Sequence, residues 1–117
     1  RHLDGPLEAP RVLFRTGSFP DPEIFNTDFD ALSVELVEFL AAGGVRLVGI
    51  DTPSVDLFED RALEAHQALG RFDMANLEGL VLADVDPGLY TLVALPLRLE
   101  GADASPVRAV LLEGPGP

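Results

Sequence analysis

The sequence predicts an α/β fold, a mixed sheet with crossover helices. Residues 11–15 and 45–50 are short apolar segments on either side of a helical pattern, and this order gives parallel strands joined by a crossover helix. Two further apolar runs, residues 89–99 and Val107–Leu112, follow a proline-glycine turn and add later strands. We therefore expect one sheet that contains both parallel and antiparallel strands.

The first strand, residues 11–15, leads into an unusually long loop at residues 16–32. Loops of this length inside compact domains are often lids or binding loops. Phe19, Phe25 and Phe29 are spaced through the loop. We favour the simpler interpretation, in which the three rings anchor the loop to the core.

The first helix is predicted over Val34–Ala42, with Ser33 as its cap and two glycines at its end. The strand at residues 45–50 follows and runs into Asp51. Because the carboxyl ends of parallel strands meet at one edge of the sheet, the turns at residues 15–18 and 51–54 are expected to lie together. Open α/β sheets bind ligands at that edge.

A second helix is predicted over residues 61–69, with Asp60 as its cap and Gly70 at its end. A short strand over residues 74–77 then leads into Glu78. Within the later run, Pro96 removes a ladder donor, which places that strand at an edge or at a bulge.

The composition indicates one domain over residues 1–117, with flexible ends at 1–9 and 114–117. The formal net charge of −12 argues against binding to nucleic acid or to an anionic membrane. No apolar run is long enough to span a membrane. The absence of cysteine excludes disulfides and thiolate metal sites and suits a cytoplasmic protein.

Three residues have the chemistry of a candidate site. His66 and Glu78 could bind a metal, although such a pair is more often unrelated on the surface. Asp51 ends a buried strand, where a carboxylate must find partners. It either accepts from the backbone amides of Thr52 and Ser54 in a local turn or takes part in catalysis. The sequence has no phosphate-binding loop, nucleophile elbow or H-E-x-x-H motif.

Several segments together carry a resemblance to a known family. They are residues 45–56, the spacing of His66 and Glu78, and residues 77–80, 87–90, 94–97 and 103–110. In this order and spacing they resemble the carboxyl-terminal half of the bacterial kynurenine formamidases, in the cyclase family of metal-dependent hydrolases. The likeness runs from about Pro10 to Val110, so it is more specific than any single motif.

The resemblance implies hydrolysis of N-formyl-L-kynurenine to L-kynurenine and formate, in tryptophan degradation, at a zinc site that is often binuclear. It implies that His66 and Glu78 are metal ligands and that Asp51, Thr52 and Ser54 line the pocket. The family's other ligands and its acid–base histidine lie in an earlier H-x-G-T-H-x-D-x-P segment, which this sequence lacks and His2 does not match. We therefore assign no catalytic residue and expect a fragment, without the N-terminal half of the fold, that is inactive alone.

Two alternatives remain beside this interpretation. The chain could be a truncated, non-catalytic interaction or dimerisation module. It could also belong to a relative that hydrolyses another amide or a lactam such as isatin. The resemblance further implies a homodimer, which would cover apolar surface left by a half-length chain.

Overall fold

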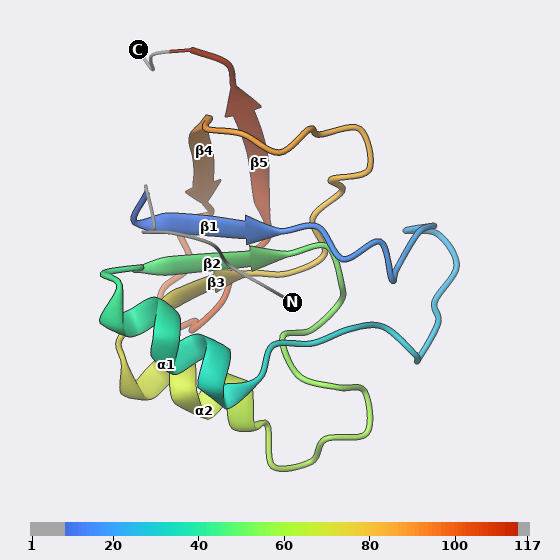
Figure 1. Cartoon of the computed structure of the whole chain (residues 1–117), viewed down its shortest axis with the longest axis vertical. Coiled ribbons are helices and arrows are strands. Elements are labelled where there is room, and N and C mark those ends of the chain that lie inside the picture. The colour runs from blue at the N-terminus through green and yellow to red at the C-terminus, as the bar shows by residue number, and fades with distance from the viewer. Residues whose placement is uncertain (1–8, 115–117) are drawn as a thin grey trace. The chain divides into compact units, whose positions relative to one another are not determined.

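The computed structural model describes residues 9–114 of the chain (Figure 1). His2 and nearly all of the expected flexible ends, 1–9 and 114–117, lie outside these residues. The chain forms two compact units, Arg1–Val85 and Asp86–Pro117. The single domain expected from the sequence stays a prediction.

The first unit contains a three-stranded parallel sheet with the order β1-β2-β3. Its strands are β1 (Arg11–Phe14), β2 (Leu47–Ile50) and β3 (Ala75–Leu77). The register places Arg11 opposite Leu47 and Leu47 opposite Ala75. The parallel pair predicted around the first helix is therefore confirmed.

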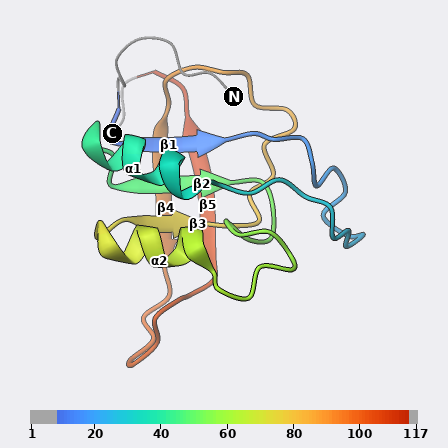
Figure 2. The same cartoon turned by 60° about the horizontal axis from the view of Figure 1, so that its bottom comes forward.

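Two helices, α1 (Val34–Ala42) and α2 (Glu64–Arg71), connect these strands and pack against each other. Figures 1 and 2 show them side by side along the sheet. The core between helices and sheet is apolar and includes Val37, Leu40, Val48, Ile50 and Leu69. Of the residues that the structure describes, neither helix is long and apolar enough to cross a membrane.

Helix α1 has the bounds that the sequence predicts. The Ser33 hydroxyl accepts a hydrogen bond of 3.1 Å from the Leu36 amide, which satisfies one of the free donors at the helix start. At the other end, the Gly43 amide bonds back to the carbonyls of Phe39 and Leu40.

Helix α2 begins later than predicted, at Glu64 instead of residue 61, and its cap is not Asp60. Leu63 occupies the cap position in a left-handed conformation, with φ of 52° and no side-chain capping bond. The Asp60 carboxylate instead accepts from the amides of Ala62 and Leu63, one turn too early. The predicted cap is wrong because this local turn captures the side chain before the helix starts.

The second unit is a two-stranded antiparallel sheet of β4 (Thr91–Pro96) and β5 (Val107–Leu112). Pro96 is the last residue of β4, where a missing donor is tolerated. The Ser105 hydroxyl accepts a hydrogen bond of 2.8 Å from the Leu97 amide and closes the connection. The α/β class is confirmed, and in residues 9–114 the parallel and antiparallel strands form two separate sheets.

Candidate metal site and neighbouring pocket

The carboxyl ends of β1 and β2 meet at one edge of the parallel sheet, as predicted. Asp51, which follows β2, accepts hydrogen bonds from the Thr16 and Gly17 amides, both of which follow β1. The Thr16 hydroxyl adds a third donor at 2.7 Å. Glu78 follows β3 directly, so this edge also holds one of the predicted metal ligands.

Asp51 joins the turn after β1 to the turn after β2 and does not close a local turn within residues 51–54. The local alternative, acceptance from the amides of Thr52 and Ser54, is not the arrangement in the structure. Asp51 is 8% exposed, and its carboxylate oxygens accept hydrogen bonds from Thr16 and Gly17. Asp51 therefore has a structural explanation that needs no catalytic role.

The other two predicted pocket residues form the turn itself. Thr52 is fully buried, and its hydroxyl donates to the Ser54 carbonyl at 2.7 Å. The Ser54 hydroxyl accepts from the Asp56 amide at 3.1 Å. These bonds shape the backbone at residues 52–56.

His66 and Glu78 come together although they belong to different elements. His66 is in the first turn of α2, and Glu78 lies just beyond β3. The His66 Nε2 atom is 3.2 Å from Glu78 Oε2. Both side chains are about one-third exposed, so the pair remains accessible to a ligand.

Asp56, which the sequence does not single out, contacts the candidate ligand His66. Its carboxylate is 3% exposed and lies 2.7 Å from His66 Nδ1, on the side of the ring opposite Glu78. Burial raises the pKa of Asp56, but hydrogen bonds from the His66 and Ala65 amides and from the His66 ring outweigh it and hold the pKa below its usual value. The sequence feature that could have indicated Asp56 is an acidic residue shortly before the helix that contains His66.

The donor set fits part of a zinc site. An imidazole nitrogen and a carboxylate oxygen are both common zinc ligands, and two such atoms on a tetrahedral ion lie about 3.3–3.5 Å apart. The observed 3.2 Å separation is close to that range. Within residues 9–114, no group of three or more potential ligands is clustered to hold a metal. Since a zinc site takes at least three protein ligands, further ligands would have to come from elsewhere.

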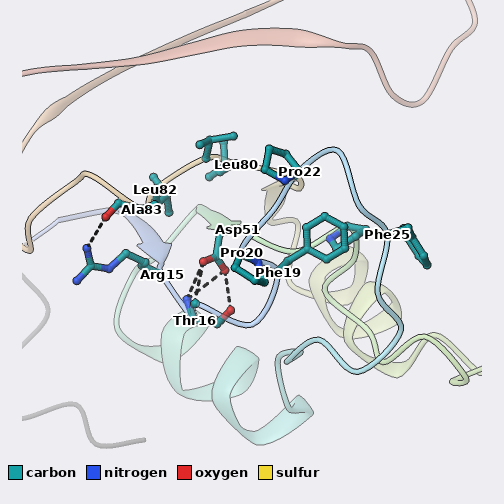
Figure 3. A pocket seen from close by; sticks show the side chains of 14 residues that line it. Arg15, Thr16, Phe19, Pro20, Pro22, Phe25, Asp51, Leu80, Leu82 and Ala83 are labelled. Atoms are coloured by element: carbon teal, nitrogen blue, oxygen red, sulfur yellow. Dashed lines mark hydrogen bonds between the residues drawn. The ribbon is translucent and has the colours of Figure 1, made fainter.

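A pocket of about 690 Å³ opens at the same sheet edge (Figure 3). Arg15, Thr16 and Asp51 line one part of it, and the Arg15 guanidinium is fixed by hydrogen bonds to the Ala83 and Val85 carbonyls. Gly79, the neighbour of Glu78 in the chain, also contributes to the wall. The pocket wall therefore continues the chain directly after Glu78, although neither Glu78 nor His66 lines the pocket.

Aromatic rings from the long loop form the apolar part of this pocket. Phe19 and Phe25 line it and pack edge to face with centroids 5.8 Å apart. Phe29 is buried at 3% exposure, whereas Phe25 is 57% exposed. The burial of Phe29 agrees with the predicted anchoring of the loop, whereas Phe25 is largely exposed and does not act as a buried anchor. Figure 3 shows Phe19 and Phe25 on the side of the pocket away from Arg15.

Comparison with known proteins connects this site to an enzyme family. The kynurenine formamidase of Sphingopyxis alaskensis is 52% identical over 105 residues, covering 90% of this chain and 50% of that protein. The kynurenine formamidase of Bordetella pertussis is 52% identical over 104 residues, covering 89% and 50%. The chain spans about half the length of the curated relatives it matches. No family model matches the sequence.

Solved structures of metal-dependent hydrolases have the same fold as this chain over the residues that superpose. A protein described as a potential metal-dependent hydrolase with cyclase activity superposes with a TM-score of 0.81 at 34% identity, covering 94% of this chain and 53% of that chain. A predicted metal-dependent hydrolase from Bacillus stearothermophilus superposes equally well, covering 94% and 52%. The resemblance inferred from the sequence is confirmed.

Proposed function

We propose that this chain forms part of a metal-dependent arylformamidase of the cyclase family, because it is similar to kynurenine formamidases and to metal-dependent hydrolases over about half of their length. The complete protein would hydrolyse N-formyl-L-kynurenine to L-kynurenine and formate. In this proposal the chain is a fragment that supplies two metal ligands, His66 and Glu78. It lacks the family's first metal-binding motif and would have little activity alone.

The approach of His66 Nε2 to within 3.2 Å of Glu78 Oε2 is the observation that carries the proposal. The two residues are separated in the sequence and come from different elements, yet both are held in place by hydrogen bonds. Asp56 contacts the imidazole, and the Val55 amide donates to Glu78 Oε2 at 2.9 Å. Such outer contacts orient the ligands of metal sites.

We propose zinc as the metal, in a binuclear site of the complete protein, because the donors are nitrogen and oxygen and the sequence has no cysteine. When bound, zinc supplies Lewis acidity that polarises a carbonyl group and makes water more acidic. His66 and Glu78 would bind it through Nε2 and a carboxylate oxygen. The remaining ligands and the acid–base histidine would come from the segment that this sequence does not contain.

The pocket supports an aryl substrate. Phe19 and Phe25 offer ring faces and edges against which an aromatic ring packs at centroid distances of about 4.5–7 Å. Pro20, Pro22 and Leu80 extend the apolar wall. We infer that the aromatic part of the substrate lies here, with its formamide directed to the edge that carries Glu78.

We further propose that the protein is a cytoplasmic homodimer. Zero cysteines suit a reducing compartment. Several large apolar side chains of the described residues are exposed, including Ile24, Leu57 and Leu95. A second copy or the rest of the protein would cover such surface.

The test uses the whole protein encoded by the gene, including any segment upstream of Arg1. His66→Ala and Glu78→Ala should each lower formylkynurenine turnover by about 10²-fold or more, since lost metal ligation removes several kcal/mol of transition-state stabilisation. Metal content, measured on the same samples, should fall with activity.

Glu38→Ala is the matched control, because Glu38 is a half-exposed carboxylate whose Arg71 partner is at the 4.0 Å limit of an ion pair. It should leave turnover and metal content unchanged. Full activity in both ligand variants would refute the metal assignment. Metal binding without formylkynurenine turnover would instead favour another amide or a lactam as substrate.

A further inference from the structure

One short turn contacts both candidate metal ligands. Val55 and Asp56 are consecutive residues between β2 and α2. The Val55 amide donates to Glu78 Oε2 at 2.9 Å, and the Asp56 carboxylate lies 2.7 Å from His66 Nδ1. The two ligands are therefore held by neighbouring residues, both of which are buried.

Asp56 also fixes the backbone that carries the imidazole. Its Oδ1 accepts from the Ala65 amide at 2.7 Å, and its Oδ2 accepts from the His66 amide at 3.0 Å. The same Oδ2 faces His66 Nδ1. One carboxylate thus determines both where the Cα of His66 lies and how its ring is turned.

These contacts determine which ring nitrogen holds the proton in the neutral imidazole. The Asp56 carboxylate is acceptor-only, is 3% exposed and is at 2.7 Å, whereas Glu78 is 30% exposed and its oxygen is 3.2 Å from Nε2. A hydrogen bond is stronger at the shorter distance and in the drier surroundings. The proton therefore belongs on Nδ1, and the Nε2 lone pair faces the Glu78 oxygen.

Two electron-pair donors that face each other form a place for a cation. With Nδ1 protonated, the Nε2 lone pair is open, and Glu78 Oε2 has a second lone pair beside the one that accepts from the Val55 amide. No proton has to leave Nε2 before a metal binds. A histidine that binds metal commonly donates its other ring N–H to a carboxylate, which fixes both tautomer and ring orientation.

We propose that Asp56 is a positioning residue, which holds His66 in the Nδ1-protonated form so that Nε2 and Glu78 are assembled as a ligand pair before the metal binds. This inference rests on the proposed metal-binding function of His66 and Glu78. It adds a residue and a mechanism that the ligand pair alone does not include.

A purely structural role for Asp56 makes a different prediction. Helix α2 has no side-chain cap at Leu63, so the Asp56 carboxylate also stabilises its first turn. Asp60 provides a matched comparison, because its carboxylate accepts two amides just before the same helix, those of Ala62 and Leu63. If Asp56 only stabilised the helix start, replacing either residue would affect His66 equally.

The decisive measurement is the tautomer of His66 in the metal-free 117-residue chain, read from the imidazole ¹⁵N shifts at a pH where the ring is neutral. His2→Gln removes the second histidine signal. The wild-type ring should be protonated at Nδ1. Asp56→Asn keeps the size of the side chain but can place its N–H₂ donor against Nδ1. Nδ1 would then accept this hydrogen bond, so the imidazole proton should move to Nε2. Asp60→Asn should leave the tautomer unchanged.

In the whole protein, Asp56→Asn should weaken Zn²⁺ binding by about 10–100-fold, the usual range for such outer partners. Asp60→Asn should not. An Nε2-protonated ring in the wild-type chain, or the same tautomer change in both variants, would overturn the proposal. The wild-type measurement decides the question even if Asp56→Asn fails to fold. Because it needs no metal, it is also independent of whether His66→Ala abolishes metal binding.

Discussion

At the scale of single residues, the edge of the parallel sheet is organised by three carboxylates with different tasks. Asp51 joins the turns after β1 and β2, Asp56 holds the imidazole of His66, and Glu78 is held by a backbone amide. Asp51 and Asp56 are buried, and each accepts several hydrogen bonds. The Glu78 side chain, by contrast, is about one-third exposed. Only Glu78 therefore has the accessibility expected of a ligand.

The clamp role of Asp51 leads to a stability prediction. Asp51→Asn should lower the free energy of unfolding by about 1–3 kcal/mol, because an amide nitrogen would meet the Thr16 or Gly17 N–H and leave a partly buried donor without its acceptor. Urea denaturation of the metal-free chain measures this change.

The exposed Asp84 supplies the control for this prediction. Asp84→Asn should change stability by less than about 0.5 kcal/mol, as surface substitutions usually do. Equal stabilities for the wild type and Asp51→Asn would show that the clamp contributes nothing, and would reopen the catalytic interpretation of Asp51.

The site illustrates which residue-level contacts a sequence can reveal. The spacing of His66 and Glu78 becomes informative only through the resemblance to a family, because their approach depends on how α2 and β3 pack. The role of Asp56 depends on the path of the turn before α2, which carries no periodic signal. The meeting of Thr16 with Asp51 was predictable in outline, since it follows from parallel strand order.

At the scale of elements, the bounds of helix α1 and strand β5 were predictable from the sequence, whereas the start of helix α2 was not. Helix α1 has the predicted bounds because apolar periodicity, a serine cap and paired glycines agree there. Strand β5 also has its predicted bounds, which follow the apolar run of residues 107–112. Helix α2 starts three residues late because Asp60 forms a local turn and Leu63 adopts a left-handed conformation. No propensity rule indicates a left-handed leucine.

Capping of α1 can be tested at this scale. Ser33→Ala should destabilise the chain by about 0.5–2 kcal/mol, because the Leu36 amide loses its acceptor. Thermal unfolding monitored by circular dichroism is a suitable measurement. Ser33→Asp keeps an acceptor at the same place and adds a charge that favours the helix N-terminus, so it should retain the wild-type midpoint. A midpoint shared by all three proteins would contradict the capping role.

At the scale of the whole molecule, the chain has twenty acidic and eight basic residues. One of the few cationic groups, the Arg15 guanidinium, donates to two backbone carbonyls, those of Ala83 and Val85. The surface ion pair between Arg71 and Glu38 is long, at 4.0 Å. Repulsion among carboxylates therefore opposes the compact state.

Salt should relieve this repulsion. Raising the ionic strength from about 0.01 M to about 0.15 M shortens the Debye length from about 30 Å to about 8 Å and should raise the midpoint of thermal unfolding. Sodium chloride is the appropriate salt, because sulfate also strengthens apolar burial. A midpoint that falls steadily with sodium chloride would show that attractive pairs outweigh the repulsion.

The parallel register of the first sheet also determines the order in which the chain can fold. Each of its strand pairs closes a loop that contains a whole helix, whereas β4 and β5 are joined by a short connection. The entropy lost on closing a loop increases with its length, and non-local pairing slows folding. The pairing of β1 with β2 closes a longer loop than the pairing of β2 with β3. We therefore expect His66 and Glu78 to meet early in folding, with β1 joining last.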